Sequence, residues 1–182
     1  MSGGSVVQGP RVILISGLPG TGKSTLATGL GQRIGAVILS WDQARQRVSG
    51  PLRALDRGFT RLSGRYRRGF QEQANRRLGK AVTHELAAGR PVVVEVVADG
   101  VIRRRLEKLA AEHGSPVRSI EVTCPDSAEH ARRLRCRPGN WNQIVAHMAK
   151  SYQPSPTALV INSCTDPGEM VNQAAQFVCR DS

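Results

Sequence analysis

The stretch that most constrains the fold is GLPGTGKST, residues Gly17–Thr25. Its spacing, G-x-x-x-x-G-K-[ST], is that of a phosphate-binding loop, and the apolar, strand-like run Arg11–Ser16 precedes it. The segment after the loop has apolar residues at four-residue spacing, Leu26, Leu30 and Ile34, which predicts a helix. A strand, loop and helix in this order turn backbone N–H groups toward phosphate oxygens at the positive end of the helix. The sequence therefore predicts a nucleotide-binding site.

The loop also assigns individual contacts. Lys23 would reach the outer phosphates of ATP or GTP, and the Ser24 hydroxyl would bind Mg²⁺ together with Asp42 or Glu95 acting through water. The residues expected to contact the nucleotide are Gly17, Leu18, Pro19, Gly20, Thr21, Gly22, Lys23, Ser24 and Thr25, with Arg133 from a later segment.

Strand-like and helix-like segments alternate along the rest of the chain. This alternation predicts an α/β fold, a single P-loop domain with a five-stranded parallel sheet and helices on both faces. The expected strands after the first cover residues 36–40, 91–97, 117–124 and 157–162, and the expected helices cover 24–34, 69–89, 100–114, 125–137, 142–152 and 166–179. The long polar stretch from Trp41 to Arg68 carries no assigned element.

Length and composition favour one domain of ordinary size. We expect residues 1–10 to be a flexible leader and residues 11–182 to form the domain, in a cytoplasmic protein with no membrane contact, because no apolar run is long enough to span a bilayer. Four dispersed cysteines without a C-x-x-C motif indicate buried, reduced thiols rather than zinc ligands, and the four histidines are expected at the surface. The net charge of +12 indicates an anionic partner, such as a nucleotide, a phosphorylated metabolite or nucleic acid.

Ligands of such sheets bind beyond the carboxyl ends of the strands, so residues that end an apolar run are the candidates for chemistry. Asp42 and Arg45 follow the second strand, where Asp42 could accept a proton from an attacking hydroxyl or, alternatively, cap the next helix unless Ser40 does so. Glu95 ends the third apolar run and could orient Mg²⁺ waters or bind a substrate hydroxyl, and Asp99 is a further candidate for substrate binding.

Arginines gather in two places. In the run ARRLRCRPG, Arg133 and Arg137 lie four residues apart on one helix face, just before Pro138 and Gly139, which predicts a small Arg-rich lid over residues 132–150 that brings positive charge to the transferring phosphoryl group. The alternative is a solvated basic helix. A second group of eight arginines lies between Arg45 and Arg68, where it either binds an anionic acceptor or forms a solvated surface.

The quoted motifs resemble those of an AAA_33-like group of P-loop kinases that includes polynucleotide 5′-kinase, chloramphenicol phosphotransferase and the zeta toxins. GLPGTGKST, WDQAR and RRLRCRPGNWNQIVAHMAKSY carry the resemblance, which runs from about Arg11 to Ile161. It implies that Asp42 is the general base, that Arg45 contacts the acceptor, and that the third segment is a lid. These relatives often end the third strand in Asp, whereas this chain has Glu95.

Three functions fit these observations. The first is an ATP- or GTP-dependent phosphotransferase with Lys23, Asp42, Arg133 and Arg137 as catalytic residues, acting on a hydroxyl of a small molecule, which would include a nucleoside-like or other antibiotic in a self-resistance role. The second is a polynucleotide 5′-hydroxyl kinase, which the net charge favours and the scarcity of aromatic residues disfavours. The third is a nucleotide-binding regulatory module without catalysis.

Overall fold

Five strands form one parallel sheet in the order β2-β3-β1-β4-β5. The computed structural model describes residues 11–48, 64–97, 100–137, 139–150 and 152–180, without the side chains of residues 64–68. The strands are β1 (Val12–Ser16), β2 (Val37–Ser40), β3 (Val92–Glu95), β4 (Val117–Thr123) and β5 (Leu159–Asn162). The predicted five-stranded parallel sheet is therefore confirmed, and the phosphate loop follows its central strand.

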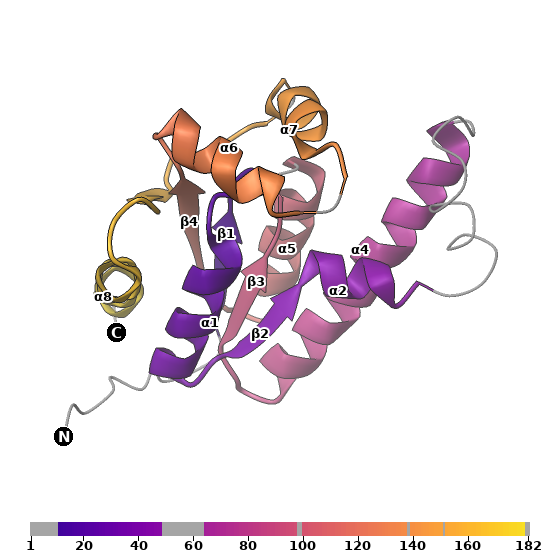
Figure 1. Cartoon of the computed structure of the whole chain (residues 1–182). Coiled ribbons are helices and arrows are strands. Elements are labelled where there is room, and N and C mark those ends of the chain that lie inside the picture. The colour runs from indigo at the N-terminus through magenta and orange to yellow at the C-terminus, as the bar shows by residue number, and fades with distance from the viewer. Residues whose placement is uncertain (1–10, 49–63, 98–99, 138, 151, 181–182) are drawn as a thin grey trace.

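Helices cover both faces of the sheet, and Figure 1 shows α6 and α7 beyond the end at which the strands finish. The helices of the described ranges are α1 (Lys23–Ile34), α2 (Trp41–Gln46), α4 (Gly64–Ala87), α5 (Gly100–Glu112), α6 (Ser127–Arg135), α7 (Trp141–Ala149) and α8 (Pro167–Cys179). None of them is long and apolar enough to cross a membrane.

The polar stretch after β2 differs from the prediction because it is partly helical. Helix α2 occupies its first six residues, and α4 begins at Gly64 instead of Gly69. These segments have few apolar residues, so their helical spacing gives little signal, although Arg, Gln and Glu are good helix formers. Residues 49–63, which carry three of the arginines considered above as acceptor contacts (Arg53, Arg57 and Arg61), lie outside the described residues.

Two apolar layers hold the sheet between its helices. On one face, Ile13 and Ile15 of β1 pack with Leu26 and Leu30 of α1 and with residues of α8. On the other, Leu14 packs with residues of α4 and α5. The run Val12–Ile15 is buried on both faces, which explains why it reads as continuously apolar, and each such side chain contributes about 1.5–3 kcal/mol to folding.

Helix α1 packs tightly against β2 through a glycine. A Cβ built on Gly31 would lie 2.5 Å from Cγ1 of Ile38, so this helix approaches the strand more closely than an alanine would allow. Gly69 in α4 has open space around the same position.

We therefore expect opposite effects from the same substitution at these two helical glycines. Gly31→Ala should lower the free energy of unfolding by about 1–3 kcal/mol, because the methyl group overpacks the contact with Ile38. Gly69→Ala should raise it by about 0.5–1 kcal/mol through helix propensity alone. Urea unfolding of both variants measures the difference, and a stabilised Gly31→Ala would show that the contact with Ile38 is looser than described.

Candidate functional site

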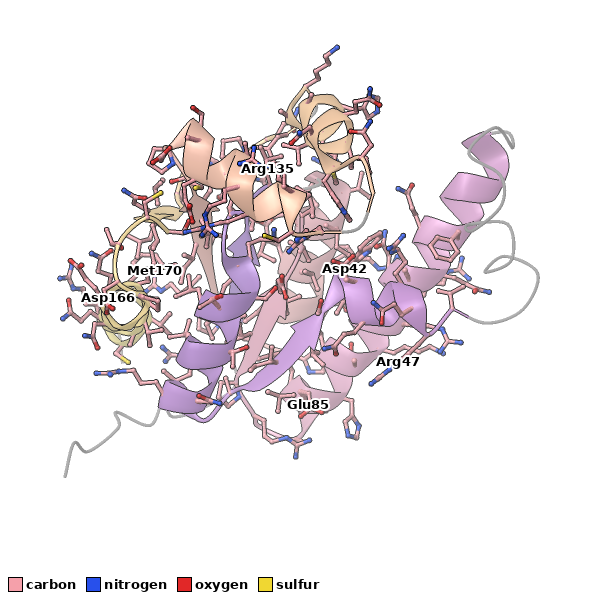
Figure 2. All side chains as sticks on the ribbon, in the orientation of Figure 1. Asp42, Arg47, Glu85, Arg135, Asp166 and Met170 are labelled. Carbon is pink, nitrogen blue, oxygen red and sulfur yellow. The ribbon has the colours of Figure 1, made fainter. Side chains whose placement is uncertain are left out.

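A cleft of about 1020 Å³ lies at the carboxyl ends of the strands. Its floor is the phosphate loop, one wall comes from α2 and α4, and the other comes from α6 and α7. Figure 2 shows Asp42 on the side of α2 toward α6 and α7, whereas Glu85 lies at the opposite end of the molecule. The topology thus gathers residues from across the chain around one loop.

The phosphate loop depends on glycine at its two ends. Gly17 has φ 151°, and a Cβ there would lie 2.4 Å from the backbone oxygen of Val122, so only glycine fits beside β4. Gly22 occupies the N-cap position of α1 with φ 91°. The loop therefore delivers the first residues of α1, Lys23 and Ser24, to the floor of the cleft, where the helix N-terminus favours an anion.

Lys23 is almost fully buried, with 7% of its surface exposed, and its Nζ donates a hydrogen bond of 2.8 Å to the carbonyl oxygen of Leu18. Burial lowers the pKa of Lys23 to about 8. The carboxylates of Glu95 and Asp42 act in the opposite direction, and the guanidinium of Arg137 lowers the pKa further. These three side chains therefore lie within electrostatic reach of the Lys23 ammonium.

Ser24 and Glu95 meet directly, since the Ser24 hydroxyl donates a hydrogen bond of 2.6 Å to Oε1 of Glu95. Glu95 ends β3 beside Ile15 of β1, which places its carboxylate next to the phosphate loop. A hydroxyl and a carboxylate oxygen at this spacing are ligands that Mg²⁺ prefers. The contact is compatible with the predicted magnesium site, in which Ser24 would bind the ion and Glu95 or Asp42 would act through water; that site stays a prediction.

Asp42 and Arg45 both line the cleft from α2. The Asp42 side chain is 62% exposed, and Oδ1 lies 3.8 Å from Nε of Arg45, a loose contact for an ion pair. Ser40, not Asp42, occupies the N-cap position of α2, and no side chain caps that end by a hydrogen bond. The alternative interpretation, that Asp42 is the helix cap, is therefore wrong.

Arg133 is held in place on α6 before any ligand binds. Its Nη1 and Nη2 donate to the hydroxyl and carbonyl oxygens of Ser163, at 2.9 and 2.8 Å, and its Nε pairs with Glu129 at 2.7 Å. The hydrogen bonds that Glu129 accepts from Arg132 and Arg133 lower the pKa of its carboxyl to about 2. The guanidinium lies close to Gly22, so Arg133 faces the predicted phosphate position.

Arg137 differs from Arg133 because it is exposed and makes a looser contact. Its guanidinium lies over the ring of Trp141, 5.5 Å from the ring centre. Both residues line the cleft. The predicted lid segment, residues 132–150, thus brings one anchored and one exposed arginine to the cleft, and its role as a lid stays a prediction. Asp99 and Pro138 lie outside the described residues.

Two expectations about single residues are wrong. His130, expected at the surface, is half-buried, and its Nε2 lies 2.8 Å from the carbonyl oxygen of Pro19 in the phosphate loop. None of the four cysteines, which we expected to be buried, is fully buried. Cys124 and Cys179 are half-buried, and Cys136 and Cys164 are exposed.

Sequence reasoning also missed several residues that shape the cleft. Ser163 follows β5, and applying the rule for strand ends to the last strand would have found it. His130 is one helical turn before Arg133 and Leu134, so its position on that face was readable. Trp41 and Phe70 line the opposite wall, where no sequence signal distinguishes a cleft residue from a core residue.

Comparison with known protein families gives one match over most of the chain. The profile of the AAA_33 family, described as an AAA domain, matches residues 12–154. The match begins at β1 and ends after α7, and it therefore includes the phosphate loop, α2 and the predicted lid.

Curated relatives of similar sequence carry no described activity. Uncharacterized proteins of Mycobacterium tuberculosis strain H37Rv and of Mycobacterium bovis are each 29% identical over 147 residues, or 76% of this chain. The chain spans only 28% of the length of these relatives.

Solved structures share the fold at low identity. A sugar kinase of Janibacter sp. HTCC2649 has a TM-score of 0.65 and 18% identity, covering 93% of this chain and 94% of its own. The APS kinase CysC of Mycobacterium tuberculosis, solved with AMPPNP and APS, has a TM-score of 0.67 and 18% identity. The match covers 94% of this chain and 99% of that kinase. A gluconokinase of Sinorhizobium meliloti 1021 has a TM-score of 0.66 and 19% identity. The match covers 96% of this chain and 94% of that gluconokinase.

The buried Lys23 leads to a prediction about nucleotide binding. Without nucleotide, Lys23 has a pKa of about 8. Phosphate oxygens favour the charged ammonium, so nucleotide binding should raise this pKa. Nucleotide binding should therefore take up close to one proton at about pH 9, where free Lys23 is mostly neutral, and almost none at about pH 7. Calorimetry with Mg²⁺ and a non-hydrolysable ATP analogue, in two buffers of different ionisation enthalpy, measures the uptake.

The control for this measurement is Lys23→Gln, which keeps a polar side chain but has no titratable ammonium. The proton uptake at high pH should disappear in this variant. Equal uptake in the variant and the wild type would show that another group titrates.

Proposed function

The chain belongs to the AAA_33 family and has the fold of P-loop kinases, and from this premise we propose that it transfers the γ-phosphoryl group of ATP or GTP to a hydroxyl of a small molecule. The observation that carries the proposal is the grouping of Asp42, Glu95 and Arg137 around the buried ammonium of Lys23. A base, a metal ligand and two cations in one cleft are the parts that phosphoryl transfer requires.

Each residue has a step in this proposal. The carboxylate of Asp42 accepts the proton of the acceptor hydroxyl as its oxygen forms a bond to the γ-phosphorus, and the bond from that phosphorus to the bridging oxygen of the β-phosphate breaks. Lys23 and Arg137 stabilise the negative charge on the phosphoryl oxygens. Ser24, with Glu95 acting through water, would hold Mg²⁺, which would supply further charge neutralisation on the phosphates.

Arg133 is assigned a positioning role at the nucleotide. Its guanidinium points toward the predicted phosphate position while it is bonded to Ser163. Nucleotide binding would therefore cost little conformational entropy of the Arg133 side chain. Arg137 is exposed in the described state and would approach the phosphoryl group as residues 132–150 close over the cleft.

The walls of the cleft favour an acceptor with an apolar body. Trp41 and Phe70 line one side, and Trp141, Ile144 and Met148 of α7 line the other. Ile144 keeps 42% of its surface exposed at this position, so an apolar ligand that covers it would gain binding free energy. Asp42 and Arg45 supply a base and a cation beside this apolar space. An aromatic or otherwise apolar alcohol fits this mixture, and an antibiotic of that build, including a nucleoside-like one, belongs to this class.

A polynucleotide acceptor has less support from the described residues. Strand-binding grooves stack successive bases on a row of aromatic side chains along a basic track. Here Trp41 packs against Val48, Phe70 and Ala74, and its Nε1 donates to Oδ1 of Asn75, so only part of its ring faces the cleft. The aromatic residues of the cleft form the walls of one compartment rather than a track.

The assignment of Asp42 as the general base predicts a loss confined to turnover. Asp42→Asn should lower kcat by roughly 10²–10⁴, because the amide cannot accept the hydroxyl proton. Its affinity for Mg-nucleotide and its melting temperature should stay close to those of the wild type, because the exposed side chain caps no helix. Gln46→Ala, on the same helix and outside the cleft, is the control and should keep full activity. Turnover of Asp42→Asn within about threefold of the wild type would remove Asp42 from the mechanism.

The acceptor is identified by incubating the protein with Mg-ATP and a panel of hydroxyl compounds, and by detecting the phosphorylated product by mass spectrometry. We expect aromatic alcohols to be phosphorylated in preference to sugar acids and polyols. For the acceptor that is found, Ile144→Ser should raise KM roughly fivefold by removing apolar contact. Val160→Ser is the matched control, since Val160 is 60% exposed but lies outside the cleft, and it should change nothing.

The same panel contains a 5′-hydroxyl oligonucleotide. Phosphorylation of its end, with affinity falling by roughly a thousandfold between about 50 and 200 mM salt, would replace the small-molecule proposal with polynucleotide kinase activity. Nucleotide binding without transfer to any compound would instead support the regulatory module.

A further inference from the structure

Two cysteines far apart in the sequence lie side by side at the ends of neighbouring strands. Cys124 follows β4 directly, and Cys164 lies two residues after β5. Thr123 and Asn162 are partners in the β4–β5 register, and this pairing brings the two thiols together. Their Sγ atoms are 3.4 Å apart. A disulfide bond is about 2.0 Å long, so a shift of roughly 1.4 Å would suffice to form one.

The position of the pair makes this proximity consequential. Ser163, the neighbour of Cys164, accepts the two hydrogen bonds that Nη1 and Nη2 of Arg133 donate. The cysteines are 40 positions apart, and the segment between them contains both α6 and α7. A bond between the two sulfurs would therefore join the two ends of the segment that forms one wall of the cleft.

We propose that Cys124 and Cys164 form a reversible redox-modification site, which a small-molecule disulfide such as oxidised glutathione converts to an intramolecular disulfide. The exposed thiolate of Cys164 attacks one sulfur of glutathione disulfide, and one glutathione leaves as its thiolate. The Cys124 thiolate then attacks Sγ of Cys164 in the mixed disulfide and releases the second glutathione. The two cysteines give up two protons and two electrons in total, and these reduce glutathione disulfide to two thiols.

The surroundings of the two thiols support this order. Burial and the contact with Cys164 raise the pKa of the Cys124 thiol, although the charge of Arg133 acts in the opposite direction. Cys124 is half-buried, whereas Cys164 is exposed. The bulky glutathione therefore reaches Cys164 first, and Cys124 needs only to attack a sulfur that is already beside it.

The chain supplies its own control cysteines. Cys136 is exposed and directly follows the last residue of α6, and Cys179 is half-buried at the end of α8. Neither is paired with another cysteine among the described residues. Exposure alone would favour modification of Cys136 as much as that of Cys164, whereas proximity favours a bond between Cys124 and Cys164.

The test is oxidation of the full chain and its four single Cys→Ser variants with oxidised glutathione, followed by thiol counting and intact mass. The wild type, Cys136→Ser and Cys179→Ser should each lose two thiols and the mass of two hydrogens, and dithiothreitol should restore both. Cys124→Ser and Cys164→Ser should form no intramolecular disulfide and instead carry glutathione. Circular dichroism checks that each variant is folded.

Two measurements on the wild type stand independently of the variants. Peptide mapping should recover a cross-link between Cys124 and Cys164, and the oxidised protein should melt about 5 °C or more above the reduced one, because the bond closes a long loop. Oxidation that leaves four free thiols, pairs Cys136 or Cys179, or yields only linked dimers would overturn the proposal.

Discussion

The burial of Lys23 beneath its own loop is the constraint on which the candidate site depends. An ammonium group with so little exposed surface is costly to keep charged, and the cost appears in its lowered pKa of about 8. The Leu18 carbonyl and the carboxylates of Glu95 and Asp42 offset part of it. The loop, the end of β3 and the start of α2 must therefore lie together for the same electrostatic reason. A nucleotide triphosphate would supply the negative charge that this arrangement lacks.

The parts of the structure that could be predicted are those in which a short pattern has one physical solution. Continuous apolar runs such as Val12–Ile15 are typical of strands covered on both faces, and β1 and β3 are buried in this way. Asp126 and Asp166 each accept two backbone N–H groups at a helix start, as capping rules expect. The extent of α4 was not predictable, because its first turns carry little apolar periodicity.

Within the site, the predictable residues were those attached to strand ends, and the unpredictable ones were contacts between segments. Asp42 and Glu95 follow from the rule that ligands bind beyond the carboxyl ends of parallel strands. The contact of His130 with Pro19 depends on how α6 lies over the phosphate loop, and no local pattern encodes that angle. The approach of Cys124 to Cys164 depends on the register of β4 with β5, which sequence alone does not supply.

The two arginines of α6 and its following turn show how one sequence motif can supply two kinds of cation. Arg133 and Arg137 lie four positions apart and both reach the cleft, but among the described residues Arg133 alone of the two has fixed hydrogen-bond acceptors, in Ser163 and Glu129. A cation held by three hydrogen bonds stabilises charge that is already present, as on a bound nucleotide. In the proposed mechanism, a cation resting on Trp141 is less constrained and would follow charge that develops during transfer. The division of labour between binding and turnover would then arise from which of the two arginines has fixed hydrogen-bond acceptors.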